Sequence, residues 1–150
     1  MTASANALGT VERAFRDVPR PPNAELRHPD CFDDSDLAPL YAFASWRDMT
    51  DADIIGSYAA PSFLSAAGFR FFLPAYLSYA LRNPNSAEAC VSTTIWHLDP
   101  ALYDEKIAAF TRSKFELLDA AQRAAVIAFL IAMRESEYAD DAEHALGSWR

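Results

Sequence analysis

The sequence predicts an all-α protein, an irregular globule of about seven or eight short helices around two central hydrophobic helices. Alanine is abundant and only 4 of the 150 residues are glycine, and glycine is about 1 kcal/mol worse than alanine as a helix former. Apolar residues recur at spacings of three and four along most of the chain, which is the period of a helix with a buried face. The length suits one domain over residues 1–150, and short loops with mixed helix lengths argue against a regular four-helix bundle.

The first expected helix ends at the prolines that begin at Pro19, because proline supplies no backbone donor. Its apolar face is formed by Leu8, Val11, Phe15 and Val18. Residues 19–36 follow with four prolines and a cluster of acids, and we expect an ordered surface loop with a single helical turn. A helix is predicted from about Leu37 to Trp46, with Asp36 as its N-cap.

Thr50 and Asp53 come close to the spacing of a capping box, and they predict a short helix that ends before Pro61. Ser65 then begins the most hydrophobic helix, residues 66–82. A helix that is apolar nearly all round belongs in the middle of a domain. Pro74 lies inside it and is expected to kink or split it.

Residues 86–98 are ambiguous, because their β-branched residues favour a strand while their apolar spacing also fits a helix. No neighbouring segment offers a clear strand partner, so we predict a helix. Another short helix is expected over 101–111. Asp119 and Gln122 have the spacing of a capping box and begin the second central helix, 120–134, which we expect to pack against 66–82. A last amphipathic helix contains Ala142, Ala145, Leu146 and Trp149.

The net charge of −8 is unevenly distributed, with −5 on residues 1–60, +1 on 61–115 and −4 on 116–150. Long-range repulsion argues against nucleic acid and against an anionic membrane as partners, whereas a basic protein would be attracted. The acids expected to bind such a partner are Asp30, Asp33, Asp34 and Asp36. The simpler interpretation, that the charge keeps a small protein in solution, stays open.

Several features favour a cytoplasmic location. The start of the chain lacks the basic and apolar regions of a signal peptide. Prolines and glycines interrupt the weakly charged stretch 54–81, which therefore does not suit a membrane span. Cys31 and Cys90 form no C-x-x-C pair, and this is typical of a reducing compartment.

Arg70 is the only charge in 28 otherwise uncharged residues, so its guanidinium must find water, an acid or an anion. One hypothesis is an anion-binding pocket, since arginine binds carboxylate and phosphate through paired hydrogen bonds. The residues assigned to that pocket are Arg70, Tyr76, Tyr79, Trp96 and His97. The alternative is a structural ion pair with Asp51 or Asp53, or a side chain that extends to the surface.

Two histidines lie near acids in the second half of the chain. His97 and Asp99 could form a general base if the acid held one tautomer, although an interfacial histidine explains the pattern as well. His144 has Asp140 and Asp141 on the same helical face, and we expect an ion pair on the helix surface.

No metal, cofactor or catalytic residue is predicted. His28 and Cys31 stand near several acids, but their spacing matches neither a zinc nor a calcium pattern, and a solvated loop is the better interpretation. G-x-S-x-G, H-E-x-x-H and glycine-rich phosphate loops are absent from the sequence. The sequence therefore leaves an enzymatic activity open and leans against it.

Several short motifs together resemble a family of uncharacterised bacterial helical domains of unknown function. They are Phe63-Leu64-Ser65, the segment Phe69–Leu77 with its Phe-Leu-Pro-Ala-Tyr-Leu core, Leu118-Asp119 with Gln122, Phe129-Leu130, and Ala145-Leu146 with Trp149. The resemblance runs from about residue 8 to 150. It implies a bacterial, cytoplasmic protein and implies no mechanism.

Two functions follow as hypotheses. The first is a non-enzymatic acidic binding protein for a basic protein partner, with an immunity or antitoxin-like inhibitor as a concrete form. The second is a small domain that binds an anionic metabolite, or a minor enzyme, with its pocket around Arg70.

Overall fold

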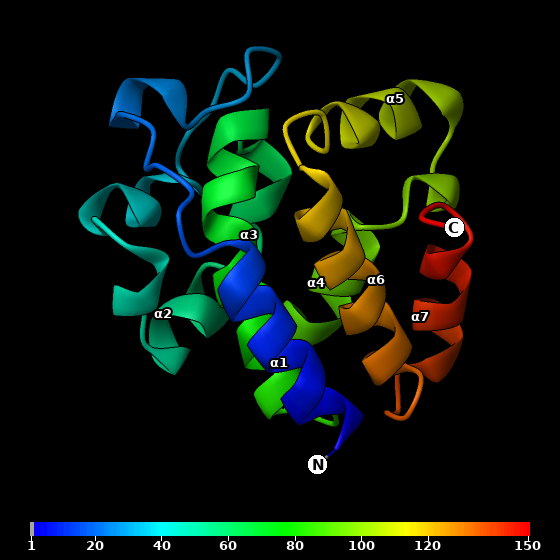
Figure 1. Cartoon of the computed structure of the whole chain (residues 1–150). Coiled ribbons are helices and arrows are strands. Elements are labelled where there is room, and N and C mark those ends of the chain that lie inside the picture. Colours follow the sequence, from blue (N-terminus) through cyan, green and yellow to red (C-terminus); the bar gives the residue numbers. More distant parts are fainter. Residues whose placement is uncertain (1) are drawn as a thin grey trace.

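The structure is a computed structural model, and it describes residues 2–150. Within that range it is all-helical, as predicted, with no strand beyond one isolated bridge between Arg27 and Leu64. The α-helices are α1 (Ala3–Ala14), α2 (Asp51–Gly56), α3 (Ala66–Arg82), α4 (Ala89–His97), α5 (Glu105–Ser113), α6 (Ala120–Met133) and α7 (Ala139–Leu146) (Figure 1). Short 3-10 helices are η1 (Asn23–Glu25), η2 (Ala38–Ala42), η3 (Trp46–Asp48), η4 (Ala60–Phe63) and η5 (Pro100–Leu102). None of the described helices has both the length and the apolarity that a membrane crossing requires.

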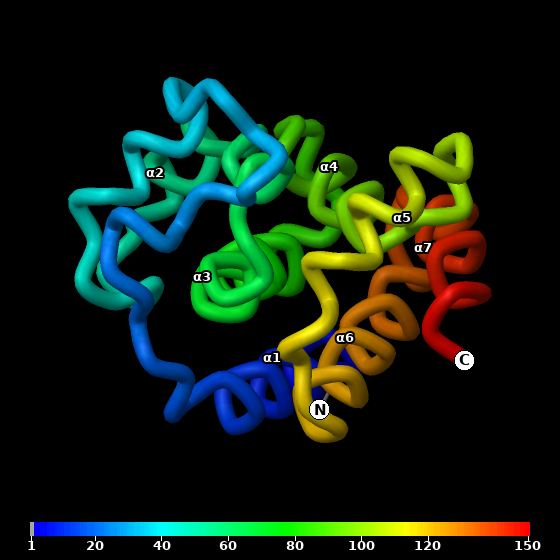
Figure 2. The backbone as a smooth tube through the Cα atoms, turned by 90° about the horizontal axis from the view of Figure 1, so that it is seen from above, coloured from blue at the N-terminus to red at the C-terminus, as the bar shows by residue number. Residues whose placement is uncertain are grey.

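Helix α3 occupies the middle of the molecule (Figure 2). The Ser65 hydroxyl caps it by accepting from the Gly68 N–H, and every residue from Phe71 to Leu81 is buried. The helix is continuous through Pro74, so the expectation that this proline could split it is wrong. Proline removes one hydrogen bond of the helix ladder. Close packing on all sides of α3 compensates for that loss.

Helix α1 packs extensively against both predicted central helices, α3 and α6, which also contact each other directly. Ala7 and Val11 are the buried residues of α1, the Phe15 that caps it is buried as well, and Phe129 and Leu130 are among the buried residues of α6. On its other side α6 packs against α7. The amphipathic first helix, which the sequence did not place at the centre, therefore joins the two hydrophobic ones.

The helix predicted from Leu37 to Trp46 is wrong. The segment forms the separate helices η2 and η3, and Asp36 is not the cap, because Leu37 holds the N-cap position without a side-chain bond. The chain leaves the helical conformation at Phe43, which is extended with φ −103° and ψ 121°. Arg20 binds this turn: its Nε donates to the Phe43 carbonyl at 2.6 Å, and its Nη2 lies 3.5 Å from the Leu40 and Tyr41 carbonyls.

Other local predictions are confirmed. Both capping boxes form, at the start of α2 and of α6. Residues 89–97 are helical, and Thr93 and Thr94 are accommodated because their hydroxyls donate to the Ala89 and Cys90 carbonyls one turn back.

The helix expected over 101–111 is displaced toward the C-terminus. The short helix η5 comes first, and Asp104 then caps α5.

Gln122 connects three helices. Its side chain is 1% exposed, and its Oε1 accepts from the Asp119 N–H at 3.0 Å and from Arg70 Nε at 3.2 Å. Its Nε2 donates to the Ala14 carbonyl at 3.2 Å. The capping glutamine of α6 therefore also holds the central arginine of α3 and the end of α1.

Replacing this glutamine should cost substantial stability. We expect Gln122→Ala to lower the free energy of unfolding by about 2–4 kcal/mol, because it leaves the Arg70 guanidinium and the Ala14 carbonyl without their partner. Urea unfolding followed by circular dichroism measures the change. Glu135→Ala, at an exposed position just after α6, is the control and should lie within about 0.5 kcal/mol of wild type. Equal stability of the two variants would contradict the role of Gln122.

Two glycines should respond to alanine in opposite directions. A Cβ on Gly68 would lie 2.9 Å from Leu64 Cδ2 and 3.0 Å from the Leu26 carbonyl oxygen, whereas a Cβ on Gly56 would meet nothing within 4 Å. We expect Gly68→Ala to destabilise by about 1–3 kcal/mol through overpacking. Gly56→Ala should stabilise by about 0.4–1 kcal/mol. The same unfolding assay compares them, and a stabilising Gly68→Ala would show that the backbone contact with Leu26 is not tight.

Candidate functional site

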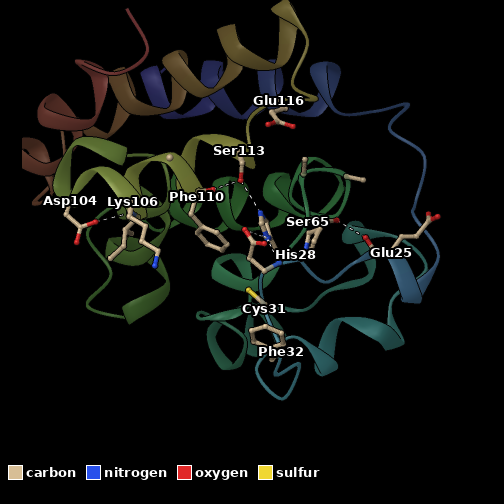
Figure 3. A pocket seen from close by; sticks show the side chains of 16 residues that line it. Glu25, His28, Cys31, Phe32, Ser65, Asp104, Lys106, Phe110, Ser113 and Glu116 are labelled. Atoms are coloured by element: carbon tan, nitrogen blue, oxygen red, sulfur yellow. Dashed lines mark hydrogen bonds and ion pairs between the residues drawn. The ribbon is translucent and has the colours of Figure 1, made fainter.

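A groove of about 1320 Å³ lies beside α5. We call it the α5 groove. Its walls are the loop after η1, the first turn of α3, and α5 with the turn on either side of it (Figure 3). The lining residues are Glu25, His28, Pro29, Asp30, Cys31, Phe32, Ser65, Ala66, Ala67, Asp104, Lys106, Ile107, Ala109, Phe110, Ser113 and Glu116.

Large apolar side chains form the exposed surface of the groove. Phe32 is 95% exposed and Ile107 is 46% exposed, and the half-buried Phe110 lines the same groove. Helix α5 supplies Ile107 and Phe110 from one of its faces, at a spacing of three. Apolar side chains that are exposed together on one surface can mark a site of interaction with another molecule.

The rim of the groove is acidic. Among its lining residues are the four carboxylates Glu25, Asp30, Asp104 and Glu116, against the single amine of Lys106. The predicted partner-binding acids Asp33, Asp34 and Asp36 lie outside the lining, exposed on the loop that continues from Phe32. The Ser35 N–H donates to Asp33 at 2.8 Å and lowers the pKa of that carboxyl. The Tyr41 hydroxyl donates to Asp34 at 2.9 Å.

His28 is a buried, neutral part of the groove wall. Its Nδ1 accepts from the Asp30 N–H at 3.0 Å, so Nε2 carries the proton and donates to Ser113 Oγ at 3.1 Å. The Ser113 hydroxyl in turn donates to the Phe110 carbonyl. Burial lowers the pKa of His28, and in this arrangement its ring has no lone pair directed at the serine. The pair therefore orders the loop and does not activate Ser113 as a nucleophile.

Two further reactive groups lie close to the groove. Burial raises the pKa of the Cys31 thiol, which disfavours its nucleophilic thiolate form. Lys114 is buried with its Nζ 4.4 Å from the centroid of the Phe110 ring. Burial lowers the pKa of this amine to about 8. The Lys114 charge thus lies beneath the same ring that lines the groove.

The residues predicted as an anion pocket are not brought together around Arg70. Arg70 Nε donates to Gln122, and the predicted ion pair with Asp51 or Asp53 is wrong, because Asp51 pairs with Arg82 at 3.0 Å. Asp53 accepts from the Thr50 N–H in the capping box.

The aromatic members of that prediction have separate environments. The buried Tyr76 hydroxyl bonds Ser57, and the Tyr79 hydroxyl lies 3.5 Å from Ser86 Oγ. Trp96 is exposed, and the His97 ring lies 3.5 Å from Ser62 Oγ and from the Tyr58 carbonyl. Tyr76 and Tyr79 lie about one turn apart on α3, yet their hydroxyls have partners on different neighbouring segments of the chain.

Both predicted histidine–acid pairs are corrected by one contact. His144 Nδ1 lies 2.5 Å from Asp99 Oδ2, so Asp99 does not pair with His97, and His144 does not pair with Asp140 or Asp141. The bonded carboxylate is 1% exposed. It links α7 to the turn after α4, 45 residues away in sequence. Across residues 2–150 no cluster of three or more His, Cys, Asp or Glu side chains is arranged to hold a metal ion.

The acids of the loop are evident in the sequence, but the groove is not. Phe32 follows Cys31 and precedes two aspartates, and an isolated aromatic within an acid cluster was the available signal. The contribution of α5 had no such signal, because Ile107 and Phe110 fit a core-facing helix stripe equally well.

Stability should fall as the pH is lowered from about 7 to 4. Burial lowers the pKa of His97 to about 4, while a histidine in the unfolded chain has a pKa near 6.5. Between these values the unfolded chain binds a proton that the folded chain does not, so protons favour unfolding. We expect His97→Gln to lose about 1–2 kcal/mol less than wild type over this range. Urea unfolding at several pH values measures the slopes, and parallel curves would contradict the assignment to His97.

Comparison with known proteins gives a family without a described activity. No curated protein and no solved structure matches the chain significantly. A family model described as a family of unknown function, DUF6714, matches residues 4–149. This match covers nearly the whole chain and agrees with the resemblance seen in its motifs. The chain therefore belongs to the DUF6714 family.

Proposed function

We propose that this protein is a non-enzymatic binding protein of the bacterial cytoplasm, and that its α5 groove takes a basic, amphipathic segment of a protein partner. An immunity or antitoxin-like inhibitor is a concrete form of this function. The observation that carries the proposal is the position of Phe32, a nearly fully exposed aromatic at the edge of an apolar groove with an acidic rim.

The groove supplies the two components of a protein interface. Aromatic residues dominate the binding energy of such interfaces, typically as central anchors surrounded by weaker contacts. Phe32, Ile107 and Phe110 would pack against the apolar face of the partner segment. Charged rims contribute more to the rate of encounter and to specificity than to affinity.

The negative charge around the groove supports a partner that carries lysine or arginine. The four carboxylates of the rim outnumber its one lysine, and three further aspartates extend the negative surface along the same loop. A segment with lysine or arginine on one face and leucine-like side chains on the other matches both features. Salt should weaken its binding, because exposed charges are screened over about 10 Å at 0.1 M ionic strength.

The cysteines support the cytoplasmic part of the proposal. Cys31 and Cys90 are both free, and Cys90 is buried. Free thiols of this kind persist most readily where the environment is reducing.

The test is fluorescence polarisation with labelled amphipathic helical peptides. We expect a peptide of lysine and leucine to bind with a Kd in the range of about 1–100 μM at low salt, and a peptide of glutamate and leucine not to bind. Phe32→Ala should weaken the lysine peptide about tenfold or more. Asp30→Asn with Asp104→Asn should reduce the salt dependence of the binding.

Matched controls distinguish binding in the groove from non-specific binding of the peptide elsewhere on the surface. Leu117 is exposed to 48% but does not line the groove, so Leu117→Ala should leave the affinity unchanged. Asp48→Asn removes an exposed acid elsewhere on the surface and should act likewise. Equal binding of both peptides, or equal loss in Phe32→Ala and Leu117→Ala, would refute the proposal.

A further inference from the structure

We propose that a second cavity, on the other side of α5, binds a small organic anion whose oxyanion group is carried on a flat, apolar body. We call this cavity of about 510 Å³ the C-terminal cleft. Its lining residues are Pro100, Ala101, Tyr103, Glu105, Ala108, Arg112, Phe115, Arg123, Ser148 and Trp149. Its volume lies in the range of small-molecule sites, about 300–1,000 Å³.

Two guanidinium groups give the cleft a local positive charge. Arg112 and Arg123 line it together with the single carboxylate of Glu105, on a chain whose net charge is −8. Arg123 Nη2 donates to the Phe115 carbonyl at 3.0 Å, and within residues 2–150 no carboxylate lies within 4.0 Å of Arg123. Its other N–H groups are available to an oxyanion, which arginine binds through paired bonds.

Aromatic rings line the cleft beside these charges. The Phe115 and Trp149 rings have centroids 4.7 Å apart, and the Arg123 guanidinium lies 5.7 Å from the centroid of Trp149. Trp149 is held in place because its Nε1 donates to the Leu98 carbonyl at 2.7 Å. A bare inorganic anion would leave this apolar wall unused, and a neutral ring would leave Arg123 unpaired. A ligand that carries an anionic group on a flat apolar body would contact both the apolar wall and Arg123.

Glu105 acts against the ligand in this arrangement. Its Oε1 lies 2.6 Å from Arg112 Nη2 in an exposed ion pair. The anion would compete with Glu105 for that guanidinium and would also be repelled by its charge. Removal of the Glu105 charge should therefore tighten binding, an effect that a general loss of structure would not produce.

The proposal is tested by two-dimensional NMR of the full ¹⁵N-labelled chain, with the Trp149 indole N–H signal as the probe of the cleft. That signal is assigned by its loss in Trp149→Phe. Indole-3-carboxylate and adenosine monophosphate are titrated to about 10 mM, beyond the weakest Kd of interest. Indole-3-carboxamide and adenosine are the uncharged controls. We expect at least one anion to shift the Trp149 signal saturably, and its uncharged counterpart to bind about tenfold more weakly or not at all.

The two anions distinguish the possible sources of the oxyanion. Binding of the carboxylate alone assigns an aromatic acid, and binding of the phosphate alone assigns a nucleotide-like ligand. No saturable shift with either anion, or equal affinity for the charged and uncharged forms, overturns the proposal.

Variants complete the test. Arg123→Gln should weaken the bound anion about tenfold or more, and Arg123→Lys should retain part of the affinity. Glu105→Gln should strengthen binding about two- to tenfold. Arg16→Gln, an exposed arginine after α1, is the matched control and should bind like wild type. Unchanged binding in Arg123→Gln, or weaker binding in a folded Glu105→Gln, overturns the assignment.

Discussion

A helix that is buried on every side is the constraint that organises this molecule. From Phe71 to Leu81 no residue of α3 reaches solvent appreciably, so a chain of 150 residues must cover it completely. Helices α1, α2, α4 and α6 and the short helices η3 and η4 all contact α3. One charge near its start, on Arg70, must still find a polar partner. Gln122 supplies that partner and at the same time binds the end of α1, so the same side chain satisfies the charge and joins the covering helices.

The surface left over after α3 is covered contains both candidate sites. Helix α5 packs mainly against η5, and it is therefore free to present two faces. Ile107 and Phe110 line the α5 groove, whereas Ala108 and Arg112 line the C-terminal cleft. Neighbouring residues of a helix lie about 100° apart around its axis, so one short helix separates an acidic, apolar groove from a cleft that contains two arginines. This division gives the molecule surfaces of opposite charge within a few turns of each other.

Buried polar groups in the structure are joined by contacts between residues far apart in sequence. Asp99 meets His144, His28 meets Ser113, and Arg20 meets the Phe43 carbonyl. Each contact fixes one segment against another: α7 against the turn after α4, the groove loop against α5, and the N-terminal loop against η2. The last one binds the extended residue at which η2 ends. Such contacts carry no signal in local spacing, and for that reason the sequence led to the wrong partner for His144 and suggested Asp99 as an alternative partner for His97.

The helical class, the buried centre of α3 and the capped starts of α2, α3 and α6 could all be predicted from the sequence. These depend on apolar periodicity and on side chains that bond backbone groups within four residues, so local physics is sufficient. The acidic loop around Asp30 could also be located from the sequence, because a local excess of acidic residues is enough to identify it. The fold was needed to learn that α1 joins α3 and α6, that Arg70 binds Gln122, and that Phe32, Ile107 and Phe110 line one groove. Those outcomes depend on which distant surfaces bury the most apolar area together, and the order of residues along the chain does not express that choice.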